Sequence, residues 1–343
     1  MNRRRTISLG TQGLAFLVGV AFLAVLPHWL GDFRASQVAY VGIYFIAIMG
    51  LNILTGYTGQ ISLGHGAFMA IGGYTTAIMV GHHNVRDLWT IPLAGLIAGA
   101  AGLLFGIPAL RLSGLYLALA TFAIAVALPA VLKKFHHFTG GTEGIQLFGR
   151  RGFTGKGYEH VHVLGQNLTF NNWLYYLCWT IAAVLFLVAW AVLGGRMGRT
   201  FRAIRDSEVA ATSSGVNLAL YKTLAFGVSA FYAGVAGSLF ALATTFVNPD
   251  TFPIVLSLYL LIGAVISGLG SLWGIAAGAL FIQYVPDLAS KYVSKAPGAP
   301  SVAYAVVLIV VVVLLPFGFT GLIRKATRPL TDRLFRGSYS SDQ

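Results

Sequence analysis

The stretch NILTGYTGQISLGHG, residues 52–66, joins two apolar runs, 36–54 and 61–81, through four glycines and several uncharged polar side chains. Backbone that leaves the helical conformation inside a membrane is tolerated only where protein buries it or where it lines a cavity. The stretch therefore favours either a water-filled pathway or a close packing of helices through small residues, and its composition leaves both open. The candidate pathway side chains are Asn52, Thr55, Gln60, Ser62 and His65.

Further apolar runs flank this stretch on both sides. The full set is 9–30, 36–54, 61–81, 91–110, 114–132, 173–193, 218–246, 254–267, 271–286 and 301–318. Most are about long enough to cross a hydrocarbon core of roughly 30 Å. The pattern predicts an all-α polytopic membrane protein with about ten transmembrane helices. The runs 254–267 and 271–286 are short and adjacent, so they form either two spans or one re-entrant pair.

The composition excludes several classes of protein. Apolar residues make up 57% of the 343 residues and charged residues only 10%, with a mean hydropathy of +0.76. Ordinary soluble domains are about 25% charged, so a soluble enzyme and a disordered chain are both excluded. Cys178 is the only cysteine, which excludes an intrachain disulfide and a cysteine metal cluster.

The charge is strongly basic, with 23 Lys and Arg against 10 Asp and Glu. Basic residues collect in the cytoplasmic loops of membrane proteins, and this explains the excess better than binding to nucleic acid does. The basic start (Arg3, Arg4 and Arg5), the loop 194–217 and the tail 324–343 are then all cytoplasmic. The loop 133–172 is external, and the whole chain, 1–343, forms one transmembrane domain.

The first apolar run, 9–30, has two possible interpretations. The arginines before it resemble the charged start of a signal peptide, which would be removed from the mature protein. The run is long for a signal peptide, however, and no clear small-x-small cleavage site follows it. We therefore expect a retained transmembrane helix.

Catalytic and cofactor-binding patterns are missing from the sequence. The nearest match to a nucleotide-binding loop, residues 149–157, lacks the hydroxyl residue that follows the lysine, because Gly157 stands there. No acidic residue lies in the middle of an expected span, and no histidine or carboxylate cluster has the spacing of a metal site. We expect neither enzyme activity nor a cofactor, and we expect His65 to hydrogen-bond a neighbouring helix.

The loop 198–215 is the most distinctive polar segment. Ser207 or Asp206 can cap a short helix, Glu208 would lie in its first turn, and Gly215 can end it. Arg199, Arg202 and Arg205 are three residues apart, so they share one side of a helix. The loop is either an ordinary basic surface helix or a docking helix for a cytoplasmic partner.

Five stretches together resemble the membrane permease subunits of branched-chain amino acid ABC importers, of the LivM type. They are 51–68, 110–118, 139–145, 198–215 with its continuation 221–226, and 268–274 (Gly-Leu-Gly-Ser-Leu-Trp-Gly). The resemblance implies a multi-pass protein of the bacterial cytoplasmic (inner) membrane. It also implies a second homologous permease, two cytoplasmic ATP-binding subunits, an external substrate-binding protein and membrane lipid as partners.

The resemblance assigns the loop 194–217 to coupling with the ATPase. Glu208, Ala210, Ala211 and Gly215 match the E-x-A-A…G pattern of importer permeases, with Val209 in place of the usual alanine. The coupling residues implied are Arg199, Arg202, Arg205, Asp206, Glu208, Ala210, Ala211 and Gly215. Asp206 and Glu208 would lie against a groove of the ATPase, which would carry the nucleotide chemistry.

The resemblance implies that small zwitterionic substrates, the branched-chain amino acids, pass inward. Relatives of the family are associated with urea or short amides, and a narrow uncharged route suits a small neutral amide equally well. A stand-alone secondary transporter is a further alternative, although such a protein would need ion-coupling residues of its own.

Overall fold

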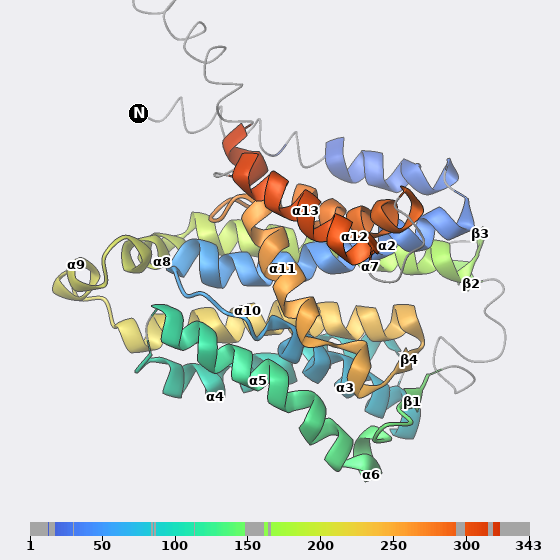
Figure 1. The fold of residues 1–343 in the computed structure, drawn as a ribbon, viewed down its shortest axis with the longest axis horizontal. Helices are drawn as coiled ribbons and strands as arrows, with labels where there is room; N and C mark the ends of the chain where they lie inside the picture. Colours follow the sequence, from blue (N-terminus) through green and yellow to red (C-terminus); the bar gives the residue numbers. More distant parts are fainter. Residues whose placement is uncertain are drawn as a thin grey trace, which may run out of the picture.

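The computed structural model describes residues 13, 18–29, 31–83, 85, 87–112, 114–147, 161–163, 166–292, 299–314 and 318–322. Most of these residues are helical (Figure 1). Six helices are long and apolar enough to cross a membrane: Asp32–Tyr57, Leu88–Ala109, Gly114–Lys134, Phe170–Gly194, Leu218–Thr244 and Pro249–Ser267. The prediction of a helical, multi-pass membrane protein is therefore confirmed. The start at Arg3–Arg5 and the tail 324–343 lie outside the described residues.

The elements follow the apolar runs, with short polar helices between them. The long helices are α2 (Asp32–Leu51), α3 (His65–His83), α4 (Asp87–Ala109), α5 (Gly114–Lys134), α7 (Phe170–Gly194), α10 (Leu218–Thr244), α11 (Ile254–Ser267), α12 (Ile275–Tyr292) and α13 (Ala299–Leu314). The short helices are η1 (Leu26–His28), the π-helical η2 (Asn52–Tyr57), α6 (His136–Thr139), α8 (Arg196–Asp206), α9 (Glu208–Ser213) and η3 (Pro249–Thr251). In the first apolar run, residues 18–25 are helical.

Helix α10 lies at the centre of the bundle, packed against α2, α3 and α4 (Figure 1). Small residues allow this close approach. A methyl group on Gly72 of α3 would overlap the backbone of Gly234 in α10, and one on Gly237 would overlap the backbone of Met69. At the contact of α10 with α4, a methyl group on Gly95 of α4 would lie 2.8 Å from Phe231 of α10. Glycines therefore set the helix crossings of the core.

The chain between α2 and α3 leaves the helical conformation. Helix α2 continues into the π-helical η2, and residues 59–64 then have no regular secondary structure until α3 begins at His65. This connection runs back along the bundle before α3 starts (Figure 1). The expected third span therefore starts at His65 rather than at residue 61, because residues 61–64 are not helical.

The segment 254–286 forms two separate helices, α11 and α12, joined by residues 268–274. Helix α12 extends to Tyr292, beyond the apolar run that ended at residue 286. Asp287 lies inside α12 and accepts a hydrogen bond from Gln37 Nε2 of α2 at 3.2 Å. The helix therefore continues past the end of the apolar run and carries an exposed carboxylate.

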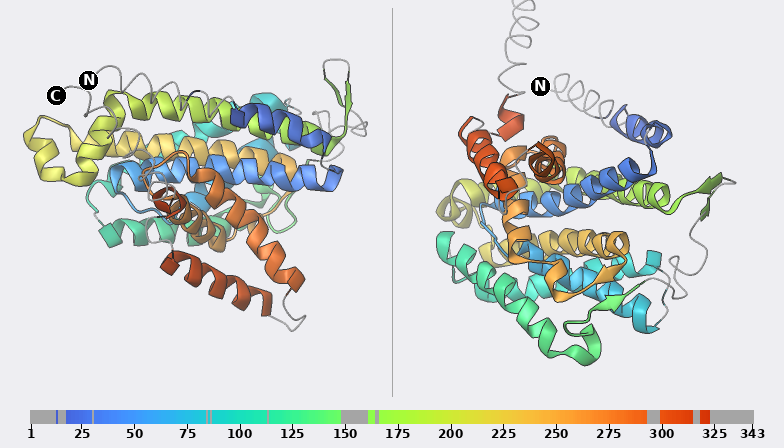
Figure 2. Two further views of the ribbon diagram at one scale, coloured as in Figure 1. Left: turned by 90° about the horizontal axis from the view of Figure 1, so that it is seen from above. Right: turned by 45° about the vertical axis from the view of Figure 1, so that its right-hand side comes forward.

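Short strands also depart from the all-α prediction. In the loop 133–172, β1 (Ile145–Gln146) pairs antiparallel with β4 (Phe246–Val247), and β2 (Val161–Val163) pairs with β3 (Gln166–Leu168). Gly140, Gly141 and Gly144 have positive φ angles and form the tight turns before β1. Figure 2 shows the β2–β3 hairpin at the end of the bundle opposite to α8 and α9. Residues 148–160, 164 and 165 of this loop lie outside the described residues.

Candidate functional site

The loop 194–217 folds into two consecutive helices, α8 and α9, that project beyond one end of the bundle (Figures 1 and 2). Ser207 caps α9, because its side chain accepts a hydrogen bond from the Ala210 amide at 3.2 Å. Gly215 has a φ of +82°, and its amide donates to Thr212 O at 2.9 Å. The predicted cap and stop are therefore both present, and Ser207 rather than Asp206 is the cap.

Helix α8 has one buried side and one polar side. Phe201 and Ile204 are 0% and 1% exposed, and they anchor the helix to the bundle. The candidate coupling residues lie mostly on the surface: Arg199, Arg205, Asp206, Glu208, Ala210 and Gly215 are exposed, Arg202 is half-buried and Ala211 is buried. We call this projecting segment the α8–α9 elbow (residues 196–215). Its exposed residues include charged side chains together with Val209 and Ala210.

Arg205 connects this elbow with the interrupted helix. Its Nη1 donates to the backbone carbonyl of Gly56 in η2 at 2.9 Å, while Nε and Nη2 each lie 3.2 Å from Asp206 Oδ1. The planar guanidinium can hold two acceptors at once in a fixed geometry. The contact joins an exposed carboxylate on the elbow to the backbone of a helix inside the bundle.

Asn52 fastens the same helix to the 268–274 connection. Its Nδ2 donates to Ser271 O at 2.6 Å, and its Oδ1 accepts from the Gly270 amide at 2.8 Å. A methyl group on Gly56 would overlap both Asn52 Oδ1 and the Gly270 nitrogen, so glycine is required there. The stretches 51–68, 198–215 and 268–274 therefore meet around Gly56. Nothing in the sequence alone indicates this contact.

The five candidate pathway side chains are all buried. Asn52 and Ser62 are 0% exposed, His65 is 1%, Thr55 is 6% and Gln60 is 7%. Thr55 Oγ1 donates to Gln60 O at 3.1 Å, and Gln60 Nε2 donates to Thr58 Oγ1 at 2.9 Å. These contacts hold the non-helical chain against the end of η2, so the polar side chains face the protein's own interior.

His65 is hydrogen-bonded to a neighbouring helix, as the sequence predicts. Its Nε2 lies 2.6 Å from Ser229 Oγ of α10, and that hydroxyl donates to Gly50 O of α2, also at 2.6 Å. Because the single hydroxyl proton goes to Gly50, the His65 Nε2 carries the proton in the other bond. The Nδ1 atom is buried without a hydrogen-bond partner in the described residues. The histidine thus links α2, α3 and α10.

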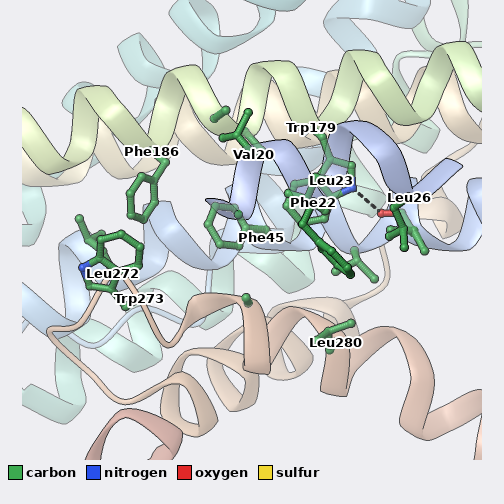
Figure 3. A pocket seen from close by; sticks show the side chains of 16 residues that line it. Val20, Phe22, Leu23, Leu26, Phe45, Trp179, Phe186, Leu272, Trp273 and Leu280 are labelled. Carbon is green, nitrogen blue, oxygen red and sulfur yellow. Dashed lines mark hydrogen bonds between the residues drawn. The ribbon is translucent and has the colours of Figure 1, made fainter. Parts of the chain in front are cut away.

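An apolar cavity of about 410 Å³ borders the 268–274 connection, and Leu272 and Trp273 line part of it (Figure 3). Its walls come from the helical residues 18–25, α2, α7 and the start of α12, and Phe186 and Trp273 meet edge to face at 5.3 Å in one wall. Trp179 donates to Val38 O at 3.1 Å. The lining residues carry no ionisable group, so the cavity suits hydrocarbon rather than a zwitterion. Among the residues that the structure describes, no three His, Cys, Asp or Glu side chains could hold a metal ion together.

Comparison with known proteins identifies the family. The family described as "Branched-chain amino acid transport system / permease component" matches residues 34–315. The chain is 33% identical over 288 residues to the high-affinity branched-chain amino acid transport system permease protein LivM of Escherichia coli K12, covering 80% of this chain and 68% of LivM. The LivM protein of Salmonella typhimurium is 34% identical over the same coverage.

A second permease is more distantly similar. The chain is 25% identical over 290 residues to the permease protein LivH of Escherichia coli K12, covering 81% of this chain and 91% of LivH. No solved structure matches the chain. The match spans both the interrupted helix and the α8–α9 elbow, and the chain therefore belongs to the branched-chain amino acid transport system permease family.

Proposed function

We propose that this chain is the membrane permease subunit of an ABC importer that passes branched-chain amino acids inward. Separate cytoplasmic ATP-binding subunits drive the transport, a second homologous permease completes the pathway, and an external binding protein delivers the substrate. The chain spans the inner membrane about ten times, with both termini in the cytoplasm. The names of the LivM and LivH relatives support the substrate class.

The contact between Arg205 and Gly56 carries this proposal. An ordinary basic surface helix would need no hydrogen bond to the interior of the bundle. Arg205 Nη1, however, donates to Gly56 O at 2.9 Å. Asn52 continues the connection from η2 to the 268–274 segment. When the ATPase pair closes, a push on the elbow would reach both segments directly, and packed helices respond to such a push by rigid shifts.

The charge of the elbow supports its cytoplasmic location. Arg196, Arg199, Arg202 and Arg205 all lie on α8, and cytoplasmic segments are enriched in arginine and lysine. The β2–β3 hairpin at the opposite end of the bundle then faces outward (Figure 2). That end would receive the substrate from the external binding protein.

Transport into proteoliposomes tests the proposal. The full chain is purified from its own host with the subunits that accompany it, and uptake of labelled L-leucine is measured with and without ATP. We expect ATP-dependent uptake and a co-purifying ATPase that is lost on deletion of 200–214. Uptake that persists without ATP would instead identify a stand-alone transporter, and ATP-dependent uptake of urea but not leucine would reassign the substrate.

A further inference from the structure

The non-helical connection 59–64 has an alternating pattern of burial. Gly59 and Ile61 are exposed and Leu63 is half-buried, whereas Gln60, Ser62 and Gly64 are buried. A period of two places successive side chains on opposite sides of an extended chain. One side of this connection therefore packs on the bundle, and the other side carries Gly59, Ile61 and Leu63. We call that outward side the 59–63 strip.

The strip extends from one end of the bundle to its middle. At one end, Gly59 lies beside Arg205 of the elbow, where an added Cβ would be 3.2 Å from the arginine side chain. At the other end, the Leu63 amide donates to Thr121 Oγ1 of α5 at 2.9 Å, and His65 bonds Ser229 near the middle of the 27-residue α10. The strip thus covers the distance that a substrate must travel to leave the middle of the bundle toward the elbow.

Contact with lipid is energetically unfavourable for this strip. Ile61 is 42% exposed, and within the described residues neither its backbone amide nor its carbonyl forms a hydrogen bond. Backbone groups without partners are unfavourable in hydrocarbon, since nothing there replaces the lost hydrogen bonds. Among the described residues no group satisfies the Ile61 backbone, and this favours water or a polar ligand over lipid as its neighbour.

We propose that the 59–63 strip, rather than the polar side chains of Gln60 and Ser62, lines the aqueous substrate route. The inference rests on the proposed import function. The backbone amide of Ile61, which has no partner among the described residues, can donate to a carboxylate, and its carbonyl can accept from an ammonium group. Ile61 and Leu63 offer apolar contact to an aliphatic side chain. This combination suits a zwitterion with a branched apolar side chain better than it suits urea.

Cysteine labelling tests the alternation residue by residue. Single cysteines replace Gln60, Ile61, Ser62 and Leu63 in a Cys178→Ala background, and the complete complex in inside-out vesicles is treated with a charged, water-soluble thiosulfonate. Residues 61 and 63 should react at least about tenfold faster than 60 and 62, because only they face water. L-leucine should slow the reaction at 61 and 63, and urea should not.

Two results would overturn the inference. Equal rates at all four positions, or faster reaction at 60 and 62, would show that the strip does not face the route. Failure of 61 and 63 to react in the complex would show that lipid or the second permease covers them.

A second measurement on the wild-type complex does not depend on the folding of variants. In hydrogen exchange, the Ile61 amide should exchange faster than the Leu63 amide, which Thr121 protects, and L-leucine should slow it. The reverse order of the two amides would contradict the proposed route.

The same preparations separate this inference from the import function. Selective labelling of residues 61 and 63 without ATP-dependent uptake would support a water-facing 59–63 strip and contradict the assignment as an ABC importer. ATP-dependent uptake with equal labelling at all four positions would contradict only the proposed role of the strip.

Discussion

Lys222 Nζ of α10 lies 2.7 Å from Glu208 Oε1 in the first turn of α9, so an ion pair fastens the elbow to the central helix of the bundle. The lysine side chain is only 10% exposed, whereas the glutamate is 49% exposed. In the proposed importer, Glu208 would lie against the ATPase. In this chain the Glu208 carboxylate also pairs with the largely buried Lys222 ammonium. Because the glutamate side chain is half exposed, a partner can still reach it.

A charge exchange should separate the two roles of Glu208. Glu208→Lys leaves two facing cations and should lower both the melting temperature and the amount of ATPase that co-purifies. The double variant Glu208→Lys with Lys222→Glu restores an ion pair. A double-mutant cycle should give a coupling energy of about 1 kcal/mol, reduced because the glutamate is half exposed.

Recovery of ATPase binding in the double variant would show that the pair acts only by holding the elbow in place. Recovery of thermal stability without ATPase binding would show that Glu208 itself contacts the ATPase. Additive effects on the melting temperature would contradict a direct interaction between the two side chains.

Replacement of Arg205 should uncouple ATP hydrolysis from transport. In Arg205→Lys the charge remains, but a single ammonium cannot hold Gly56 O and Asp206 in the same planar geometry. A hydrogen bond from a charged group contributes about 1.5–3 kcal/mol to a contact, so its loss should weaken the link between the elbow and η2 and lower the leucine uptake per ATP hydrolysed. Uptake and ATPase activity measured in the same proteoliposomes give this ratio.

Arg196→Lys is the matched control for this variant. Arg196 is exposed at the first position of the same helix, so its replacement makes the same chemical change far from Gly56. The control should keep the wild-type ratio. If Arg205→Lys also keeps it, the elbow does not act through Gly56.

Local features of the elbow could be predicted from sequence, because caps depend on neighbouring residues. Ser207 caps α9 and Gly215 takes the positive φ that ends it, and both follow from side chains within a few positions. The helical spans likewise followed from runs of apolar residues. The short strands and the extension of α12 past Pro286 were missed, because they depend on partners elsewhere in the chain.

The meeting of Asn52, Gly56 and Gly270 could not be predicted in this way. Asn52 and Gly270 are 218 positions apart in the sequence. The residues next to an asparagine do not indicate which distant backbone group its side chain will bind. The direction of the 59–64 side chains was also hidden. The sequence left open whether the polar residues line a pathway or pack between helices. Gln60 bonds the Thr58 hydroxyl and Ser62 accepts from the Gly64 amide, so both face inward, and Gly59 and Ile61 between and beside them are exposed.

Loss of the Asn52 side chain should destabilise the protein strongly. Asn52→Leu leaves the Gly270 amide and the Ser271 carbonyl without their Asn52 partner in a partly buried site. Each unsatisfied group costs about 1–3 kcal/mol, so the melting temperature in detergent should fall by several degrees. Thr75→Val is the control, because the Thr75 hydroxyl only supplements a carbonyl of its own helix at 2.7 Å. A similar small shift in both variants would contradict the importance of this contact.

The crossing of α3 and α10 should tolerate no added methyl group at Gly237. The Cβ of an alanine there would overlap the backbone oxygen of Met69, which cannot rotate away as a side chain could. Forced overpacking of this kind costs about 1–3 kcal/mol, and here the two helices must also separate. Gly194→Ala, at the end of α7, is the matched control, since no heavy atom lies within 4 Å of the added carbon. Melting temperatures of the two purified variants should differ by several degrees, with the Gly194 variant at or slightly above the wild type. Equal melting temperatures would mean that α3 and α10 do not approach each other this closely in the membrane.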